Sequence, residues 1–379
     1  MGRAGAPRMR TLIISDLHIG VAGGADVLAR PAALGALAAR LGGVDRLVLL
    51  GDTLELRHGP ARDAIARAEP IMRAIGGALA PGAEVLIVPG NHDHAIAAGW
   101  LDRRGRREAP GPLALEERVP AVKASWIAKR LAGFLAPVRV EVAYPGIWLR
   151  DDVYATHGHY LDVHFPIPMP ERLMAGAMAR MVGAIPDPAT PDDYEAILAP
   201  IYALSQASAQ RAGDGRAAVG GRSAVGTWRE LNGSARGKRA RGVALGVGFR
   251  AAVLAANRAG IGPVQTQVGV EDLRTAGLQS IGEMARRLRI APGHLIFGHT
   301  HRTGCLAQDA AGEWRTPGGT HLHNTGNWIF DTAFVRRGPA GSSPYWPGGA
   351  IALDDDGPPR LERLLGDVPA SGLRSAGRP

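Results

Sequence analysis

The amino-acid sequence predicts an α/β fold whose sheet contains parallel strands buried on both faces. Short, nearly continuous apolar runs recur along the chain, and such runs are typical of strands covered on both sides. Stretches of helical periodicity separate the first three runs, which gives the βαβαβ order of a parallel sheet. Asp, Asn or His follows each run, so we expect these side chains to meet at the carboxyl ends of the strands.

The first three strands are expected at residues 11–15, 46–50 and 84–89, with helices at 27–41 and 60–80 between them. The glycines that precede several of the polar residues suit sharp turns, where the backbone passes close to a metal or a phosphate. One polar motif follows each strand: Asp16-Leu17-His18, Gly51-Asp52 and Gly90-Asn91-His92-Asp93.

Two further strands are expected at residues 153–156 and 294–297. The motifs that follow them are His157-Gly158-His159 and Gly298-His299-Thr300-His301. About 135 residues lie between these two motifs, and they are rich in Ala, Met, Leu and Arg. Helical periodicity within this stretch predicts helices at 171–182, 191–210, 242–258 and 270–289.

The chain is therefore expected to divide into a discontinuous core, residues 10–165 and 291–356, and a helical cap or insertion at 166–290. A smaller insertion at 98–136 is expected to begin as a loop and to end in an amphipathic helix. Residues 357–379 are rich in Asp, Gly and Pro and then in Arg, Ser and Gly, which predicts a flexible tail.

Composition limits the classes of protein that fit. The 379 residues contain one cysteine, Cys305, so an intrachain disulfide is excluded and a reducing compartment is expected. We find neither a signal peptide nor an apolar span of membrane length, and we expect a cytoplasmic protein.

The residue types in the motifs point to metal chemistry. Carboxylate, amide and imidazole groups are the ligands that Mn, Fe, Zn and Co accept. Two divalent ions roughly 3.5–4 Å apart need a shared carboxylate to offset their repulsion. The Asp-x-His and His-x-His spacings place both members of each pair on one side of an extended segment. The sequence therefore predicts a hydrolytic site with two metal ions.

The five motifs, in this order and each after a strand, resemble the calcineurin-like metallophosphoesterase superfamily. The resemblance implies a four-layer α/β/β/α sandwich with a helical insertion, and two divalent metal ions, most often Mn²⁺, with Fe, Zn or Co as alternatives. By this resemblance one metal would be bound by Asp16, His18 and His301. The other would be bound by Asn91, His157 and His299, and Asp52 would bridge the two.

The resemblance also implies a mechanism, in which a metal-bridging hydroxide attacks phosphorus and breaks a phosphodiester, pyrophosphate or phosphomonoester bond. His92 resembles the histidine that protonates the leaving group as general acid. Glu55, three residues after Asp52, is expected to orient His92 through one ring nitrogen. The alternative for Glu55 is a role in the local turn or as a helix cap.

Within the superfamily, the chain resembles the UDP-2,3-diacylglucosamine pyrophosphatase group more loosely. Members of that group often carry Arg where this chain has His92, and an acidic residue where it has His159. We therefore expect a phosphorylated small-molecule or lipid-linked substrate, and the sequence does not identify it further. His159 is expected to line the substrate cleft.

A basic run in the predicted cap leaves two other partners open. Eight Arg and Lys residues lie between Arg211 and Arg241, around Trp228. This run suits a phosphorylated substrate, nucleic acid or peripheral contact with an anionic membrane. The alternative is that it reflects an Arg-rich composition and binds no partner. A nucleic-acid phosphodiesterase is not favoured, because aromatic residues for base stacking make up only 5% of the chain. A non-catalytic scaffold is less favoured still, because every expected ligand position and His92 are filled.

Overall fold

The computed structural model describes residues 9–106, 111–166, 170–211, 270–332, 335 and 339–374. The chain forms two compact units, one of Met1–Gly158 with Pro292–Pro379 and one of His159–Ala291. We call them unit 1 and unit 2 and treat each by itself. The helix expected at 242–258 and the basic run after Arg211 lie outside the described residues.

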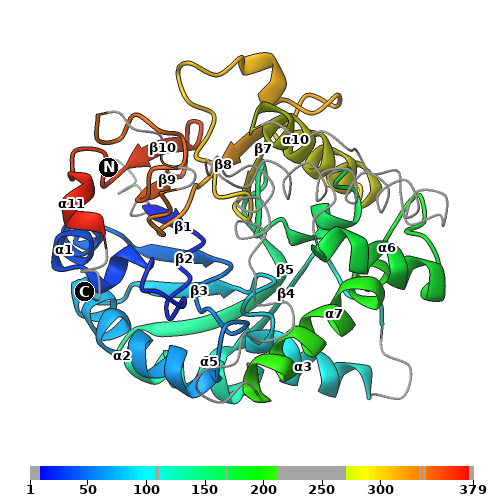
Figure 1. The fold of residues 1–379 in the computed structure, drawn as a ribbon, viewed down its shortest axis with the longest axis horizontal. Helices are drawn as coiled ribbons and strands as arrows, with labels where there is room; N and C mark the ends of the chain where they lie inside the picture. The colour runs from blue at the N-terminus through cyan, green and yellow to red at the C-terminus, as the bar shows by residue number, and fades with distance from the viewer. Residues whose placement is uncertain are drawn as a thin grey trace, which may run out of the picture. The chain divides into compact units, whose positions relative to one another are not determined.

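Unit 1 is built on a mixed sheet whose strand order is β10-β9-β1-β2-β3-β5-β6-β7-β8, with β4 paired to β5. The first strands, β1 (Thr11–Ile14), β2 (Arg46–Leu50) and β3 (Glu84–Val88), lie side by side in Figure 1 and pair in parallel. This parallel pairing confirms the expected βαβαβ start. It also places the carboxyl ends of the three strands at the same end of the sheet.

Helices α1 (Pro31–Leu41), α2 (Ala61–Ala78) and α5 (Trp126–Phe134) lie along the outer side of these strands in Figure 1. A short 3₁₀ turn (Val27–Ala29) precedes α1, and Pro31 begins the helix at a position that tolerates its missing N–H. Alternate side chains of each strand, such as Leu12 and Ile14, pack into the same apolar core as the helices.

The opposite face of β1–β3 packs into a second apolar core. Ile13, Val48 and Leu86 contribute to it from these strands, and Ala155 and Ile296 contribute from the other half of the sheet. The second half comprises β6 (Val153–Thr156), β7 (His294–Phe297) and β8 (His321–Asn324). The long strand β5 (Arg139–Arg150) joins the halves, because it pairs with β3 near its start and with β6 near its end. The inner face is thus a sheet-on-sheet core.

Two expectations for the insertion at 98–136 need correction. The stretch begins in helix α3 (Ala95–Gly105) and includes strand β4 (Glu116–Pro120), which pairs antiparallel with β5, so it is not a simple loop. The expected helix near 121–135 is two helices, α4 (Ala121–Ala124) and α5. They divide at Ser125, whose extended backbone and side-chain bond from the Ala128 N–H begin a new helix.

The carboxyl-terminal stretch also differs from expectation. Strand β9 (Gly349–Leu353) pairs with β1, and β10 (Arg360–Arg363) pairs with β9, so residues just after 357 extend the sheet. Leu365 and Leu373 are buried in the outer core, the latter on the short helix α11 (Ala370–Leu373). The prediction of a flexible tail from 357 was wrong as far as residue 374, because these side chains anchor the segment.

The described part of unit 2 is helical, as expected for an insertion. It contains a 3₁₀ segment η2 (His159–Val163) and helices α6 (Pro170–Val182), α7 (Pro191–Arg211) and α10 (Val270–Arg287). Ile197 of α7 and Ile281 of α10 are buried. None of the helices in the described ranges has the length and hydropathy needed to cross a membrane.

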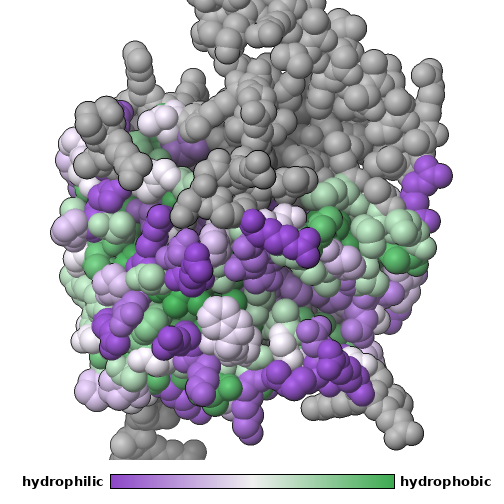
Figure 2. All heavy atoms as spheres, turned by 60° about the horizontal axis from the view of Figure 1, so that its bottom comes forward, coloured by the Kyte–Doolittle hydropathy of each residue, from purple (hydrophilic) through white to green (hydrophobic). Residues whose placement is uncertain are grey.

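The described surface is mixed in character. On the face shown in Figure 2, hydrophilic side chains cover much of the described area, and smaller hydrophobic patches lie between them. Val122 and Trp126 are among the large apolar side chains that are more than half exposed. Such scattered apolar exposure is ordinary on a folded domain.

Candidate metal centre

The loops after β1, β2, β3, β6 and β7 bring the polar motifs of unit 1 together. Many residues of these motifs also share an unusual backbone conformation. Among the described residues, six other than glycine have positive φ, and five of these were expected to bind metal: Asp16, His18, Asp52, His299 and His301, with φ from 43° to 65°. Left-handed backbone costs roughly 1–2 kcal/mol per residue and is concentrated at functional sites.

Two glycines allow the loops to approach closely, as the sequence predicted. Gly51 has φ +87°, and a Cβ there would collide with the His157 ring. A Cβ on Gly90 would collide with the carboxylate of Asp52. Any larger residue at either position would push these side chains apart.

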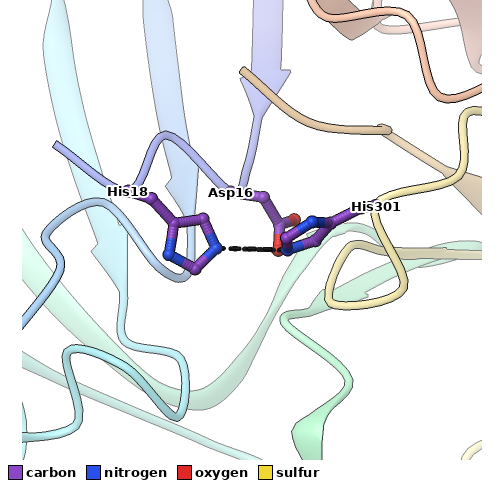
Figure 3. Close-up of side chains that lie close together, drawn as sticks. All are labelled: Asp16, His18 and His301. Atoms are coloured by element: carbon purple, nitrogen blue, oxygen red, sulfur yellow. Dashed lines mark hydrogen bonds and ion pairs between the residues drawn. The ribbon is translucent and has the colours of Figure 1, made fainter. Parts of the chain in front are cut away.

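Asp16, His18 and His301 form the first candidate metal group (Figure 3). His18 Nε2 lies 3.1 Å from His301 Nε2, and His301 Nε2 lies 3.3 Å from Asp16 Oδ1. All three ligand atoms lie within 4.8 Å of one another. The side chains come from the β1 and β7 loops, which are far apart in sequence.

The hydrogen bonding of the Asp16 carboxylate is evidence that this group fits a cation. Asp16 Oδ2 accepts bonds from the Ser15 hydroxyl and from the His299 N–H, the latter at 3.0 Å. Asp16 Oδ1 is buried and has no hydrogen-bond partner among the described residues. A buried carboxylate oxygen without a partner is costly, and a metal ion would remove that cost.

The second candidate group is Asp52, His157 and His299, with Asn91 beside it. Asp52 Oδ2 lies 3.3 Å from His157 Nε2 and 3.6 Å from His18 Nε2. Asp52 Oδ1 is held by the His92 N–H at 2.8 Å. The other oxygen, Oδ2, therefore lies between a histidine of each group, as a bridging carboxylate would.

Asn91 gives the strongest sign that the second group fits a metal. Its amide oxygen lies 3.2 Å from each of three atoms that also carry lone pairs: His157 Nε2, Asp52 Oδ2 and His299 Nδ1. The His157 Nδ1–H faces the Leu50 carbonyl at 3.0 Å, so the neutral ring presents a lone pair at Nε2. Four such acceptor atoms need a cation between them, either a proton on one of the rings or a metal ion.

The electrostatics of the metal-free residues agree with this fit. Burial lowers the pKa of His157, but Asp52 and Asp16 outweigh burial and raise that pKa to about 10. Burial likewise lowers the pKa of His18, and Glu55 and Asp52 raise it to about 9. The same carboxylates that favour protons on these rings favour metal ions at the same nitrogens, so metal binding would release protons.

Glu55 lies against both His18, an expected metal ligand, and His92, the expected general acid. Its Oε2 lies 2.8 Å from His92 Nδ1 and 3.1 Å from His18 Nδ1, and His58 Nδ1 is 3.4 Å away. Burial raises the pKa of Glu55, but His92 and His18 hold it well below its usual value. The geometry brings Glu55 and His92 together as the sequence suggested, and it adds His18, which the sequence did not suggest. A carboxylate behind a metal-binding His fixes the tautomer of that His.

Asp93 joins two of the ligand loops. Its buried carboxylate accepts bonds from the backbone N–H groups of Gly90 and Thr53, both at 2.7 Å, and of Asp52 at 3.2 Å. Burial and the nearby Asp52 raise its pKa to about 6. Asp93 thus fixes the spacing of the β2 and β3 loops.

Two asparagines that the sequence analysis did not identify hold the last ligand loop. Asn324 Nδ2 donates to the Gly298 carbonyl at 3.0 Å, and Asn327 Nδ2 donates to the His301 carbonyl at 2.7 Å. The Asn-Thr-Gly-Asn turn after residues 321–323 was the available signal. His323 lies on β8, which leads into this turn.

His159 is the first residue of unit 2. Its ring is almost completely buried and packs edge-on against Tyr160 and Tyr202, with centroids 4.9 and 5.6 Å away. A role in substrate binding stays a prediction for this residue. Arg57, which the sequence analysis did not identify, is a buried cation next to Asn91.

Comparison with known proteins identifies a family that the chain resembles. Residues 9–183 match the sequence profile of the calcineurin-like phosphoesterase family. This match agrees with the family that the sequence motifs predicted. It also agrees with the predicted α/β fold and with the predicted enzyme class, a metal-dependent phosphoester hydrolase.

Curated relatives are similar over a shorter stretch. UDP-2,3-diacylglucosamine hydrolases from three strains of Xanthomonas campestris pv. campestris are 33% identical over 112 residues. This stretch is 28% of the present chain, and the chain spans less than half, 42%, of each relative.

Two solved structures are similar at low scores. A cold-active protein-tyrosine phosphatase of Shewanella is 15% identical with a TM-score of 0.31, over 95% of this chain and 79% of that one. A dimetal phosphatase from Danio rerio is 12% identical with a TM-score of 0.30, over 92% and 96%.

Proposed function

Because residues 9–183 match the calcineurin-like phosphoesterase family, we propose that this protein hydrolyses a phosphodiester, pyrophosphate or phosphomonoester bond with two divalent metal ions. The observation that supports this most is the position of Asp52 Oδ2, which lies between His18 and His157, the imidazoles of two neighbouring candidate metal groups. A shared carboxylate is what a two-metal site requires.

In this proposal Asp16, His18 and His301 bind one metal, Asn91, His157 and His299 bind the other, and Asp52 bridges them. When bound, two such ions lower the pKa of a water between them and offset negative charge on the phosphoryl group. Mn²⁺ is our first choice for both, since this mixed set of oxygen and nitrogen ligands accepts several divalent metals.

His92 is the proposed general acid. Its Nδ1 is held by Glu55 at 2.8 Å, so its Nε2 remains to carry a proton toward the leaving group. The side chain is 19% exposed, which suits a group that must reach substrate. Glu55 acts through His92 and His18 and is therefore a positioning residue.

For the substrate, we propose a phosphorylated small molecule or a lipid-linked phosphate compound. The curated relatives are named for a diacylglucosamine nucleotide, and their partial similarity supports this class. We further propose that unit 2 contributes to the choice of substrate, as an insertion between two ligand loops. With a single cysteine, Cys305, a cytoplasmic location is proposed.

The test is hydrolysis of bis-p-nitrophenyl phosphate and p-nitrophenyl phosphate by metal-stripped protein, with Mn²⁺, Mg²⁺ or Zn²⁺ added back. We expect activity to return with metal, most with Mn²⁺. Cleavage of the diester would identify a phosphodiesterase, and cleavage of the monoester alone a phosphatase. Full activity of thoroughly metal-stripped protein would contradict the proposal.

A further inference from the structure

Three histidines lie on one face of the paired strands β7 and β8, which run side by side in Figure 1. His294 is opposite His321 in the parallel register, and His323 is opposite Ile296. Because side chains alternate along a strand, the three imidazoles share the face of Ile296, a residue of the inner core. None of the three belongs to the candidate metal groups described above.

His294 and His323 make a close nitrogen-to-nitrogen contact. His294 Nδ1 lies 3.0 Å from His323 Nε2, and the ring centroids are 5.1 Å apart. In the first candidate metal group, His18 Nε2 and His301 Nε2 are separated by a similar distance, 3.1 Å. A metal ion that binds two imidazole nitrogens at about 2.0–2.1 Å keeps them roughly 3 Å apart. The pair is thus already spaced as two ligands of one ion.

Both rings of this pair are neutral at pH 7. Burial and the nearby His321 lower the pKa of His294, and burial, with His294 and His321, lowers the pKa of His323 to about 4. A neutral imidazole keeps one lone pair for a metal. Both side chains are only half-buried, so water can complete the coordination of an ion. The N–H now shared by the two nitrogens would move to the other nitrogen of its own ring, and no proton is released.

The third histidine and the nearby cations are already engaged. His321 Nε2 accepts a hydrogen bond from Arg315 Nη2 at 2.8 Å, so the neutral ring carries its proton on Nδ1 and offers no lone pair. Arg150 is paired with Asp152 through two bonds of 2.7 and 2.8 Å. The ligand set is therefore two imidazoles without a carboxylate. Such a set favours Zn²⁺, Ni²⁺ or Cu²⁺ over Mn²⁺, which binds most weakly in this series.

We propose that His294 Nδ1 and His323 Nε2 bind a Zn²⁺-type transition-metal ion, separate from the two proposed catalytic ions, and that this ion holds β7 and β8 together. Strand β7 leads into the last ligand loop, and Asn324, next to His323, donates to the Gly298 carbonyl of that loop at 3.0 Å. An ion that binds only the folded strand pair stabilises the support of this loop. The inference does not depend on the proposed function.

The test is equilibrium dialysis of the metal-stripped full chain against excess Zn²⁺, followed by elemental analysis, as wild type, His323→Asn and His294→Gln. His321→Asn is the matched control, because it changes the third histidine of the same face. We expect about three Zn²⁺ per chain in wild type and control, and about two in each of the other variants. With Mn²⁺ in place of Zn²⁺, all four proteins should bind about two ions.

Denaturant unfolding is the second readout. Zn²⁺ should raise the unfolding midpoint more in wild type and control than in His323→Asn or His294→Gln, because the additional ion binds only the folded chain. His294 begins its strand and is half-buried, so His294→Gln decides the question if His323→Asn does not fold.

Equal Zn²⁺ content in wild type and His294→Gln would overturn the proposal, and so would an equal rise of their midpoints. Loss of one Zn²⁺ in His321→Asn would overturn the assignment of the site to His294 and His323 alone. A chain that binds one Zn²⁺ through these two histidines, and no Mn²⁺, would contradict the proposed two-metal hydrolysis and leave this site intact.

Discussion

Two histidines of this site are oriented by the hydrogen bond that each makes at Nδ1. His18 is fixed through Nδ1 by Glu55, and His157 through Nδ1 by the Leu50 carbonyl, so that Nε2 of each ring faces Asp52. Imidazoles that bind metals are commonly oriented in this way. Glu55 also holds His92, and one carboxylate therefore positions both a proposed ligand and the proposed acid.

The bridging role of Asp52 makes a direct prediction. Asp52→Asn removes the negative charge between His18 and His157, so metal and activity should be lost together. We expect hydrolysis to fall by more than about 100-fold, with fewer than two metals per chain by elemental analysis. Asp63→Asn, on the half-exposed surface of α2, is the control. Full metal content in Asp52→Asn would contradict the bridge.

His92 and Glu55 can be separated from the ligands by their kinetics. His92→Ala should keep both metals and slow hydrolysis of phenyl phosphate about 10²–10⁴-fold, but slow p-nitrophenyl phosphate much less, because that leaving group needs no proton. Glu55→Gln should act in the same direction by about 10–100-fold. His321→Ala is the control. Loss of the metals in His92→Ala would show that His92 is not the acid.

Strands and loops explain why so much of the site was predictable. Each expected strand before a motif exists, and parallel pairing brings the β1, β2 and β3 loops to one edge. A run such as Arg46–Leu50 is buried on both faces and is followed by Gly51. Its pattern therefore indicates both the strand and the turn. The placement of Asp52 after it follows from chain order alone.

Other elements depend on contacts that no local pattern records. Strand β10 pairs with β9 at the edge of the sheet, in a stretch whose Asp, Gly and Pro content suggested a tail. The division of α4 from α5 depends on one cap, Ser125. The approach of Arg57 to Asn91 arises from the folding of two separate loops, and a lone arginine in a sequence does not reveal it.

The pairing of β7 and β8 predicts a dependence of stability on pH. His294 Nδ1 lies 3.0 Å from His323 Nε2, and burial, with His294 and His321 nearby, lowers the pKa of His323 to about 4. As pH falls below 6.5 the unfolded chain binds a proton that the folded His323 takes up only near pH 4. The folded state should lose up to about 3 kcal/mol over this range.

The variant His323→Asn should therefore lose less stability than wild type between pH 7 and pH 4.5. Denaturant unfolding of metal-stripped protein at several pH values measures this difference, and removing the metals excludes a contribution from their release. An equal loss of stability in the two proteins would show that His323 is not the responsible group.

At the scale of the whole chain, every side chain of the proposed chemistry lies in unit 1. The chain leaves unit 1 after Gly158 and returns at Pro292, between the neighbouring parallel strands β6 and β7. Unit 2 is thus an insertion into a core that contains its own ligands. This arrangement fits the proposed division into a catalytic core and a unit that contributes to selection of the substrate.

Replacing residues 160–290 with a Gly/Ser linker of roughly 12 residues tests that division, because a parallel crossover needs about this length. We expect the shortened protein to bind two metals and to hydrolyse p-nitrophenyl substrates that the full chain hydrolyses. The same chain with Asp52→Asn should lose both properties. A shortened protein that folds cooperatively but binds no metal would contradict the independence of unit 1.

The most direct test of the account is a Mn²⁺ titration of the metal-stripped full chain, followed by bound metal and by hydrolysis in the same samples. The proposed site predicts two ions per wild-type chain, with activity reaching its maximum as the second ion binds. It predicts no such rise for Asp52→Asn. Maximal activity with one ion per chain, or activity independent of added metal, would contradict the two-metal site.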